Sequence, residues 1–150
     1  MLCFQTSVLV NKGENMKNLK VLEASFATLA LKVKNLHWNV SEEFFTLHKQ
    51  LDKLYDDVNE FTDKYAEKLV ILDHLALGSF EEMKEFSLIK EVKSKWFNAK
   101  EVKESVVNDL TLIIDYVLAH RDEEETCLID PLYDETLEKL LFWRWNFKKA

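Results

Sequence analysis

Two histidines and three acidic residues lie at spacings that could build a metal site. His37 and His48 stand eleven residues apart, and the acids that follow are Asp52, Asp63 and Glu67. Imidazole nitrogen and carboxylate oxygen together suit a divalent transition metal such as Fe²⁺, whereas a calcium site would use oxygen alone. A plainer interpretation also fits the acids, because an acidic helix face is often simply solvated.

Helix geometry decides which of these residues can meet. His48 and Asp52 are four apart, as are Asp63 and Glu67, so each pair shares a helix face. From position 48 to position 63 the helix returns within roughly 60° of the same direction, but it advances by roughly 22 Å. One chain therefore cannot bring both pairs to one metal ion.

Two copies of the chain could do so. If two such helices lie antiparallel across a two-fold axis, the His48/Asp52 end of one meets the Asp63/Glu67 end of the other, and two identical sites form. His37, at the end of the preceding helix, is expected at the same end as His48. None of the four histidines has Glu three residues before it. A di-iron site of the Glu-x-x-His type inside one bundle is therefore not expected.

The remaining two histidines, His74 and His120, have no partner at a useful spacing. We interpret them as structural or surface residues.

The elements that must position these residues are predicted to be helices. Two glycines and one proline in 150 residues, with 47% hydrophobic residues, favour a single all-α domain. Apolar periodicity predicts long helices over about 16–39 and 43–72, a short helix over about 79–86, and two more long helices. The first of these two starts at 98, and the last carries Pro131 in its first turn. The expected caps of the later helices are Ser41, Ser79 and Asn98.

Two helical hairpins joined by a crossover of about 25 residues with its own short helix describe a ferritin-like four-helix bundle. We expect this domain to cover residues 16–150. Residues 1–15 are expected to form an N-terminal arm, or to lie upstream of a translation start at Met16. They make a poor signal peptide because no basic region precedes the apolar residues.

Charge and cysteine content limit the partners and the compartment. The net charge of −7 argues against nucleic acid as a partner, because an acidic surface repels phosphate. No apolar run is long enough to span a membrane. Cys3 and Cys127 show no metal or redox spacing, and we interpret them as free thiols of a reducing compartment, although a disulfide stays open. We expect a cytoplasmic protein.

The sequence resembles a known family over about 19–147. The similar stretches are NLHWNV, FFTLHKQLDKLYDDVNEFTDKYAEKL, LALGSFEEMKEFSLIKE and DETLEKLLFWRW. They resemble the Dps proteins, the mini-ferritins named as DNA-binding proteins from starved cells. The resemblance implies a four-helix bundle assembled as a hollow shell of twelve identical subunits.

The resemblance also implies a ferroxidase centre, with one or two iron ions, between subunits related by a two-fold axis. The ligands carried over are His37, His48 and Asp52 from one subunit and Asp63 and Glu67 from its mate. Members oxidise Fe²⁺, preferentially with hydrogen peroxide, and store Fe³⁺ mineral, which protects against oxidative stress. Trp38 would quench stray oxidising equivalents or serve in packing.

Three features bear on how far the resemblance extends. The turn between the two histidines is one residue shorter than is usual in the family and lacks its customary glycine. This difference bears on whether His37 reaches the metal site. The acidic segment 121–134 either lines a pore for Fe²⁺ or is an ordinary solvated helix start. Its acids are Asp122, Glu123, Glu124, Glu125 and Asp130. Members that compact DNA often carry a lysine-rich terminal tail. Here the first fifteen residues hold one lysine, Lys12, and the C-terminus holds Lys148 and Lys149, so we expect no DNA binding.

Two other interpretations remain. One is a non-enzymatic Dps-like shell that acts by binding DNA or host cells. The other is a plain acidic helical bundle that stays a monomer.

Overall fold

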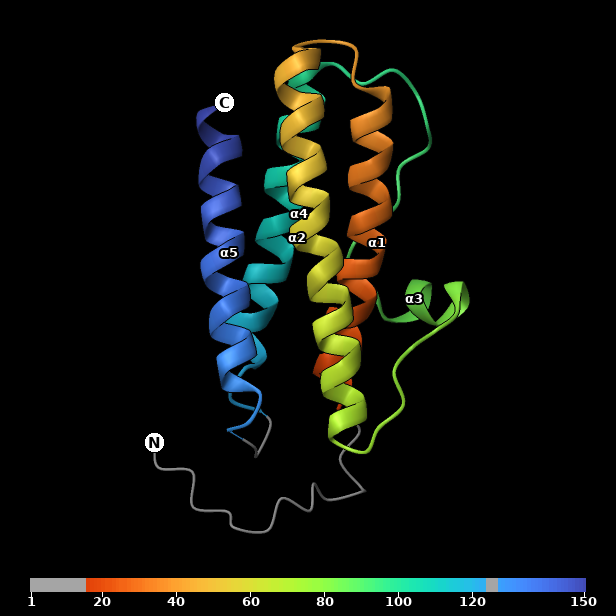
Figure 1. Ribbon diagram of the computed structural model, residues 1–150, viewed down its shortest axis with the longest axis vertical. Coiled ribbons are helices and arrows are strands. Elements are labelled where there is room, and N and C mark those ends of the chain that lie inside the picture. Colours follow the sequence, from red (N-terminus) through yellow and green to blue (C-terminus); the bar gives the residue numbers. More distant parts are fainter. Residues whose placement is uncertain (1–15, 124–126) are drawn as a thin grey trace.

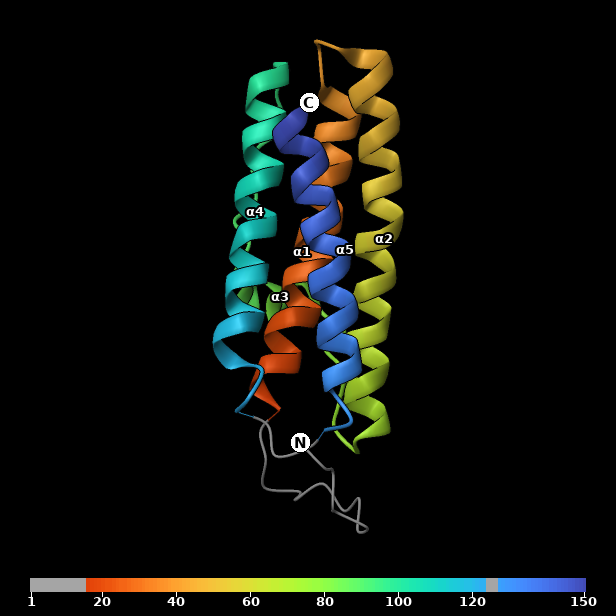
Figure 2. The same cartoon turned by 90° about the vertical axis from the view of Figure 1, so that its left-hand side faces the viewer.

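The computed structural model describes residues 16–123 and 127–150, which form five helices. The helices are α1 (Lys17–Asn39), α2 (Phe44–Ile71), α3 (Phe80–Phe86), α4 (Ala99–His120) and α5 (Asp130–Lys149). The four long helices lie side by side, and α3 lies against the outside of α1 (Figures 1 and 2). The predicted all-α bundle with a short helix in the crossover is confirmed.

The crossover from α2 to α4 sets the direction of the second hairpin. It leaves the lower end of α2 in Figure 1, passes through α3, and returns to the end at which α1 turns into α2. As a result α2 and α4 run in the same direction, and the C-terminus lies near the α1–α2 turn. That turn, the start of α4 and the end of α5 therefore share one end of the bundle.

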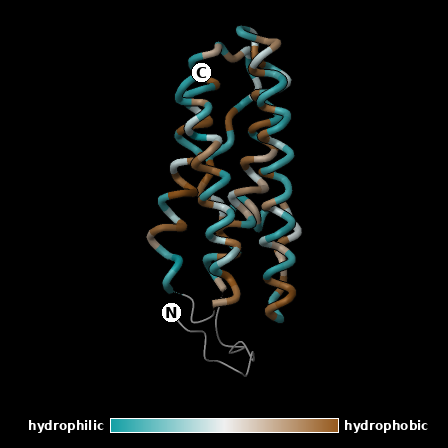
Figure 3. Tube along the Cα trace, turned by 60° about the vertical axis from the view of Figure 1, so that its left-hand side comes forward, coloured by the Kyte–Doolittle hydropathy of each residue, from teal (hydrophilic) through white to brown (hydrophobic). Residues whose placement is uncertain are grey.

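One apolar core runs along the whole bundle. Hydrophobic and hydrophilic residues alternate along the long helices (Figure 3), as expected for helices that bury one face. The most deeply buried large side chains include Phe26 of α1, Tyr65 of α2 and Tyr133 of α5. Phe26 stacks on Phe61 and on Tyr65, with ring centroids 5.1 and 5.7 Å apart. This aromatic cluster holds α1 against the half of α2 that carries Asp63 and Glu67.

Two of the three expected helix caps are confirmed. Asn98 and Glu101 form a reciprocal capping box at the start of α4, and the Ser79 hydroxyl accepts a hydrogen bond from the Glu82 backbone at the start of α3. The prediction for Ser41 is wrong. Glu43 occupies the N-cap position of α2, and the Ser41 hydroxyl instead donates to the carbonyl oxygen of Phe97. The crossover competes for the Ser41 hydroxyl, which the local sequence does not reveal.

The thiol expectation is wrong for Cys127. This residue lies in the link between α4 and α5 and is disulfide-bonded. Pairing depends on distances in the fold, which the spacing of cysteines in the sequence does not give. Cys3 lies outside the described residues, as does the rest of segment 1–15. The cysteines therefore no longer support a reducing compartment.

The structure also bears on membrane insertion. Within residues 16–123 and 127–150, no helix combines the length and the apolar character that a bilayer span requires.

Candidate metal centre

His37 and His48 hold each other through reciprocal hydrogen bonds. Nδ1 of His37 lies 2.7 Å from the carbonyl oxygen of His48, and Nδ1 of His48 lies 2.9 Å from the carbonyl oxygen of His37. A carbonyl oxygen only accepts, so both Nδ1 atoms must carry the proton. In a neutral imidazole Nε2 then keeps a free lone pair. This is the orientation in which a histidine binds a metal ion.

The two imidazoles belong to a stack of three rings. The His37 and His48 rings are nearly parallel, with centroids 3.8 Å apart and planes inclined by 17°. Phe44 covers the His48 ring at a centroid distance of 4.6 Å. Phe44 and His48 are four positions apart on α2, so the sequence held the signal for this contact, but we did not predict it.

Asp52 lies beside the histidines, one helical turn beyond His48. Its Oδ1 atom is 3.9 Å from Nε2 of His37. The structure therefore brings together His37, His48 and Asp52, the three residues predicted to come from one chain. His37 is buried, whereas the side chain of Asp52 is 54% exposed.

Lys34 contacts the same carboxylate and was missed in the sequence. Its Nζ atom donates to Oδ1 of Asp52 at 2.6 Å. This hydrogen bond, together with the charge of Lys34, holds the pKa of Asp52 below its ordinary value of 3.8. Lys34 lies three positions before His37, one turn away on the same side of α1, which was the available signal.

The short turn that carries the histidines is fixed by the end of the crossover. Phe97 donates its backbone N–H to the carbonyl oxygen of Asn39 at 3.0 Å and accepts from the backbone N–H of Ser41 at 2.9 Å. Glu42 accepts from the backbone N–H of Ala99 at 3.0 Å, and Glu43 lies 2.8 Å from Nζ of Lys103.

Glu43 adopts a positive φ of 48° without the help of a glycine. The shortened turn is thus anchored on the first turns of α4, and His37 still reaches His48 and Asp52.

Asp63 and Glu67 lie elsewhere on the molecule. Both are exposed on α2, and the eleven positions between Asp52 and Asp63 correspond to about 16 Å of helix. Within the described part of the chain, no three His, Cys, Asp or Glu side chains are arranged to hold a metal ion. A single copy therefore presents the two predicted halves of the site at separate places.

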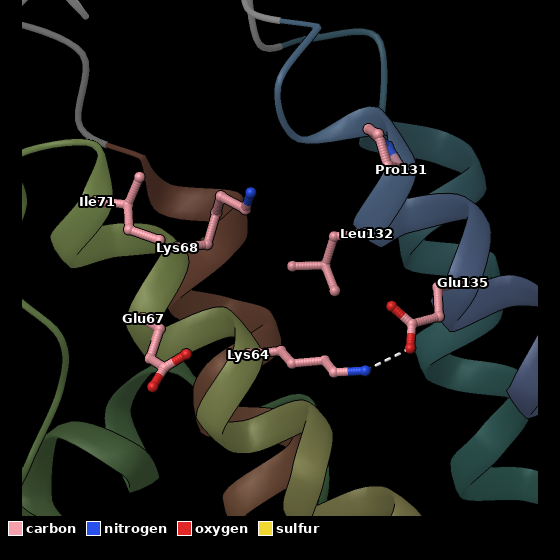
Figure 4. A pocket seen from close by; sticks show the side chains of 7 residues that line it. All are labelled: Lys64, Glu67, Lys68, Ile71, Pro131, Leu132 and Glu135. Atoms are coloured by element: carbon pink, nitrogen blue, oxygen red, sulfur yellow. Dashed lines mark hydrogen bonds and ion pairs between the residues drawn. The ribbon is translucent and has the colours of Figure 1, made fainter.

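Glu67 borders a cavity of about 290 Å³ between α2 and the start of α5. Figure 4 shows Lys64 reaching from α2 to Glu135 of α5, while the Glu67 carboxylate stays on the side of α2. Lys64 is thus directed toward α5, and Lys68 donates to the carbonyl oxygen of Leu128 in the link before α5. Glu67 itself is left exposed.

Three acids between the end of α4 and the first turns of α5 have partners within the same chain. Arg121 lies 2.8 Å from Asp134 and 3.8 Å from Asp130. Glu123 accepts from Asn18 at 3.1 Å, and Nδ1 of His120 lies 2.7 Å from Glu123. Our expectation that His120 lacks a partner is therefore wrong, because the chain turns back after α4. Glu124 and Glu125 lie outside the described residues, and the pore assignment stays a prediction.

Trp38 faces outward next to the histidines. Its side chain is 58% exposed. Trp38 therefore contributes little to packing within one chain.

Comparison with known proteins identifies a family that matches most of the chain. The ferritin-like domain family matches residues 16–125. A DNA protection during starvation protein from Helicobacter pylori (strain J99) is 33% identical over 92 residues, which cover 61% of this chain and 64% of that relative. The chain thus spans less than two thirds of that relative's length.

Solved structures share the fold of this chain. A Dps protein from Bacillus brevis is 27% identical, with a TM-score of 0.69 over 97% of this chain and 93% of that one. A DPS protein from Vibrio cholerae O1, described as a member of a superfamily of ferritin-like diiron-carboxylate proteins, has a TM-score of 0.74. It is 20% identical, and the match covers 88% of this chain and 85% of that one.

Proposed function

Because the chain belongs to the ferritin-like family and resembles the Dps proteins, we propose that it oxidises Fe²⁺ and stores the resulting Fe³⁺. In this proposal it is a ferroxidase that uses hydrogen peroxide in preference to oxygen. Removing Fe²⁺ and peroxide together protects the cell against oxidative stress.

The observation that carries the proposal is the reciprocal bonding of His37 and His48. Each histidine donates Nδ1–H to the other's backbone, which leaves both Nε2 atoms as potential ligands, and Nε2 of His37 lies 3.9 Å from Oδ1 of Asp52. Imidazole nitrogen and carboxylate oxygen are donor types that suit a ferrous ion. The donor set is incomplete within one chain, since metal sites of this kind use at least one further carboxylate.

A second copy of the chain completes the site. In a two-fold pair with antiparallel α2 helices, Asp63 and Glu67 of the second copy face His37, His48 and Asp52 of the first. Both acids are exposed in the single chain, as this arrangement requires. Phe44, which stacks on His48, is exposed, and so are Phe45 and Trp38, the latter adjacent to His37 in the sequence; this exposure supports a protein surface as their neighbour.

In the proposed reaction two ferrous ions are oxidised by one hydrogen peroxide. Each Fe²⁺ gives one electron, the O–O bond of hydrogen peroxide breaks, and two protons complete two molecules of water. Because peroxide takes both electrons, no hydroxyl radical is released. The carboxylates of Asp52, Asp63 and Glu67 offset the growing positive charge of the iron, and the histidines fix its place.

The stored mineral requires an enclosed space. We propose that the chain assembles as a homo-oligomer, a hollow shell of twelve copies as in the Dps resemblance, with Fe³⁺ inside. With a net charge of −7 per chain the shell is expected to bind no DNA, which a gel shift at low salt tests.

Peroxide-driven oxidation of Fe²⁺, followed by absorbance, tests the enzyme. The variant Asp63→Ala/Glu67→Ala removes the carboxylates of the second copy, and we expect the rate to fall by on the order of a hundredfold. The matched control is Asp56→Ala/Glu60→Ala, a pair with the same spacing on α2, which should oxidise iron at the wild-type rate. If the wild type and the Asp63/Glu67 variant oxidise iron equally slowly, the chain is not a ferroxidase.

A further inference from the structure

Lys34 holds a position in the candidate site that suits a cation. Its Nζ atom lies 2.6 Å from Oδ1 of Asp52. The same oxygen is the one that Nε2 of His37 approaches, at 3.9 Å. A positive charge is therefore already present at the Asp52 carboxylate, which is one of the proposed metal ligands.

The lysine has a second contact that does not involve the carboxylate. Nζ of Lys34 lies 4.2 Å from the centre of the Tyr55 ring, within the range of a cation–π interaction. Tyr55 is on α2, three positions after Asp52. The Lys34 side chain is 20% exposed, so it has a route to water as well. The ammonium group can leave Asp52 without being left in an apolar environment.

We propose that Lys34 is a built-in competitor for the metal, which occupies the cation position at Asp52 until a divalent ion displaces it toward Tyr55 and solvent. This inference rests on the proposed function, since it takes Asp52 as a ligand. Lys34 acts on affinity and is not itself a ligand, because an ammonium group has no lone pair to donate.

Charge explains why the two cations exclude each other. A divalent ion bound to Asp52 would lie about 4 Å from the ammonium group, where the repulsion between them is substantial even at the high effective dielectric of a protein surface. Only an ion of higher charge, with additional ligands in the histidines, replaces the lysine. Lys34 thereby raises the concentration of Fe²⁺ that is needed to occupy the site.

Removal of the charge tests the proposal. The variant Lys34→Met keeps an unbranched stem, and the control Lys49→Met removes an exposed lysine next to His48 on α2. Binding of Zn²⁺ to the assembled protein is measured by titration calorimetry. We expect Lys34→Met to bind Zn²⁺ on the order of tenfold more tightly than the wild type, from the repulsion removed, and Lys49→Met to bind as the wild type does.

The direction of the change separates this proposal from damage to the fold. A destabilised variant would bind more weakly, so equal or weaker binding by Lys34→Met overturns the proposal. A third variant, His48→Ala, tests the site itself. If His48→Ala binds Zn²⁺ as tightly as the wild type, the proposed metal centre fails. If His48→Ala weakens binding but Lys34→Met does not strengthen it, only the inference about Lys34 fails.

Discussion

At the scale of single residues, the two histidines act as one unit. Each ring is oriented by the backbone carbonyl of the other residue, and the two rings stack on each other. The loss of one side chain therefore removes the stacking contact of its partner and leaves the partner's hydrogen bond in place. This coupling was not predictable from the sequence, because it depends on how the two rings face each other.

Substitution of His48 tests this coupling. We expect His48→Ala to lower the rate of Fe²⁺ oxidation by on the order of a hundredfold or more, because it removes one proposed ligand and the ring that stacks on His37. The double variant His37→Ala/His48→Ala should be little slower than His48→Ala alone, since the residues act together. Effects that simply multiply in the double variant would contradict the coupling.

The sequence predicted part of the site. The nearness of His37, His48 and Asp52 followed from helical spacing and from the short turn, and the structure brings them together. Lys34 and Phe44 were missed, although each lies three or four positions from a predicted residue. Neither lysine nor phenylalanine binds metals, so the residue types that indicate a metal site in a sequence do not point to them.

At the scale of elements, the ends of the helices were predicted more reliably than the contacts between them. Apolar periodicity and capping residues are local signals, so all five helices and the caps of α3 and α4 followed from the sequence. The partner of Ser41 was not predictable, because Phe97 lies 56 residues away. The pairing of Cys127 likewise depends on distances that only the fold sets.

A buried ion pair joins α1 to α4. Nζ of Lys32 lies 2.8 Å from Oδ2 of Asp109, and the two side chains are only 10% and 8% exposed. Substitution of Lys32 by Met would leave the Asp109 carboxylate buried without its partner. We expect this to lower the free energy of unfolding by about 3 kcal/mol, measured by denaturant titration. The double variant Lys32→Met/Asp109→Leu should recover most of the loss.

The effect of Lys32→Met should depend on pH. Burial raises the pKa of Asp109 above its ordinary value of 3.8, and Lys32 opposes that shift. A carboxyl whose pKa is raised by folding contributes stability that is full below its ordinary pKa and is lost as the pH rises through the raised pKa. Without Lys32 the pKa of Asp109 rises further. The stability gap between Lys32→Met and the wild type should therefore narrow as the pH is lowered toward 4, and a gap independent of pH would contradict this account.

At the scale of the whole molecule, the exposed apolar side chains indicate an assembled protein. Large side chains that one chain leaves in solvent include Phe45, Leu75, Phe80, Trp96 and Trp145. An interface with a second copy would remove side chains of this kind from water. The sequence predicted the assembly only through the separation of its two half-sites and through the family resemblance, because neither composition nor periodicity reports which surface a second copy covers.

Light scattering coupled to size-exclusion chromatography tests the assembly. We expect a homo-oligomer of about 212 kDa, the mass of twelve copies of the 17.7-kDa chain. A single species of 17.7 kDa would contradict both the shell and the shared site. Of the interpretations of the sequence, only the plain acidic helical bundle predicts such a monomer.

A subunit-mixing experiment tests the central claim, a site shared by two copies. One variant, His48→Ala/Asp52→Ala, lacks the first half of the site, and the other, Asp63→Ala/Glu67→Ala, lacks the second. Alone, each should oxidise Fe²⁺ only at the background rate. In a two-fold pair formed by one chain of each variant, one of the two sites is intact and the other is doubly defective.

Random mixing during assembly therefore predicts recovery of about a quarter of the wild-type rate, since half of the pairs are mixed and each has one intact site of two. A mixture no more active than the two variants measured separately would show that no site is shared between copies.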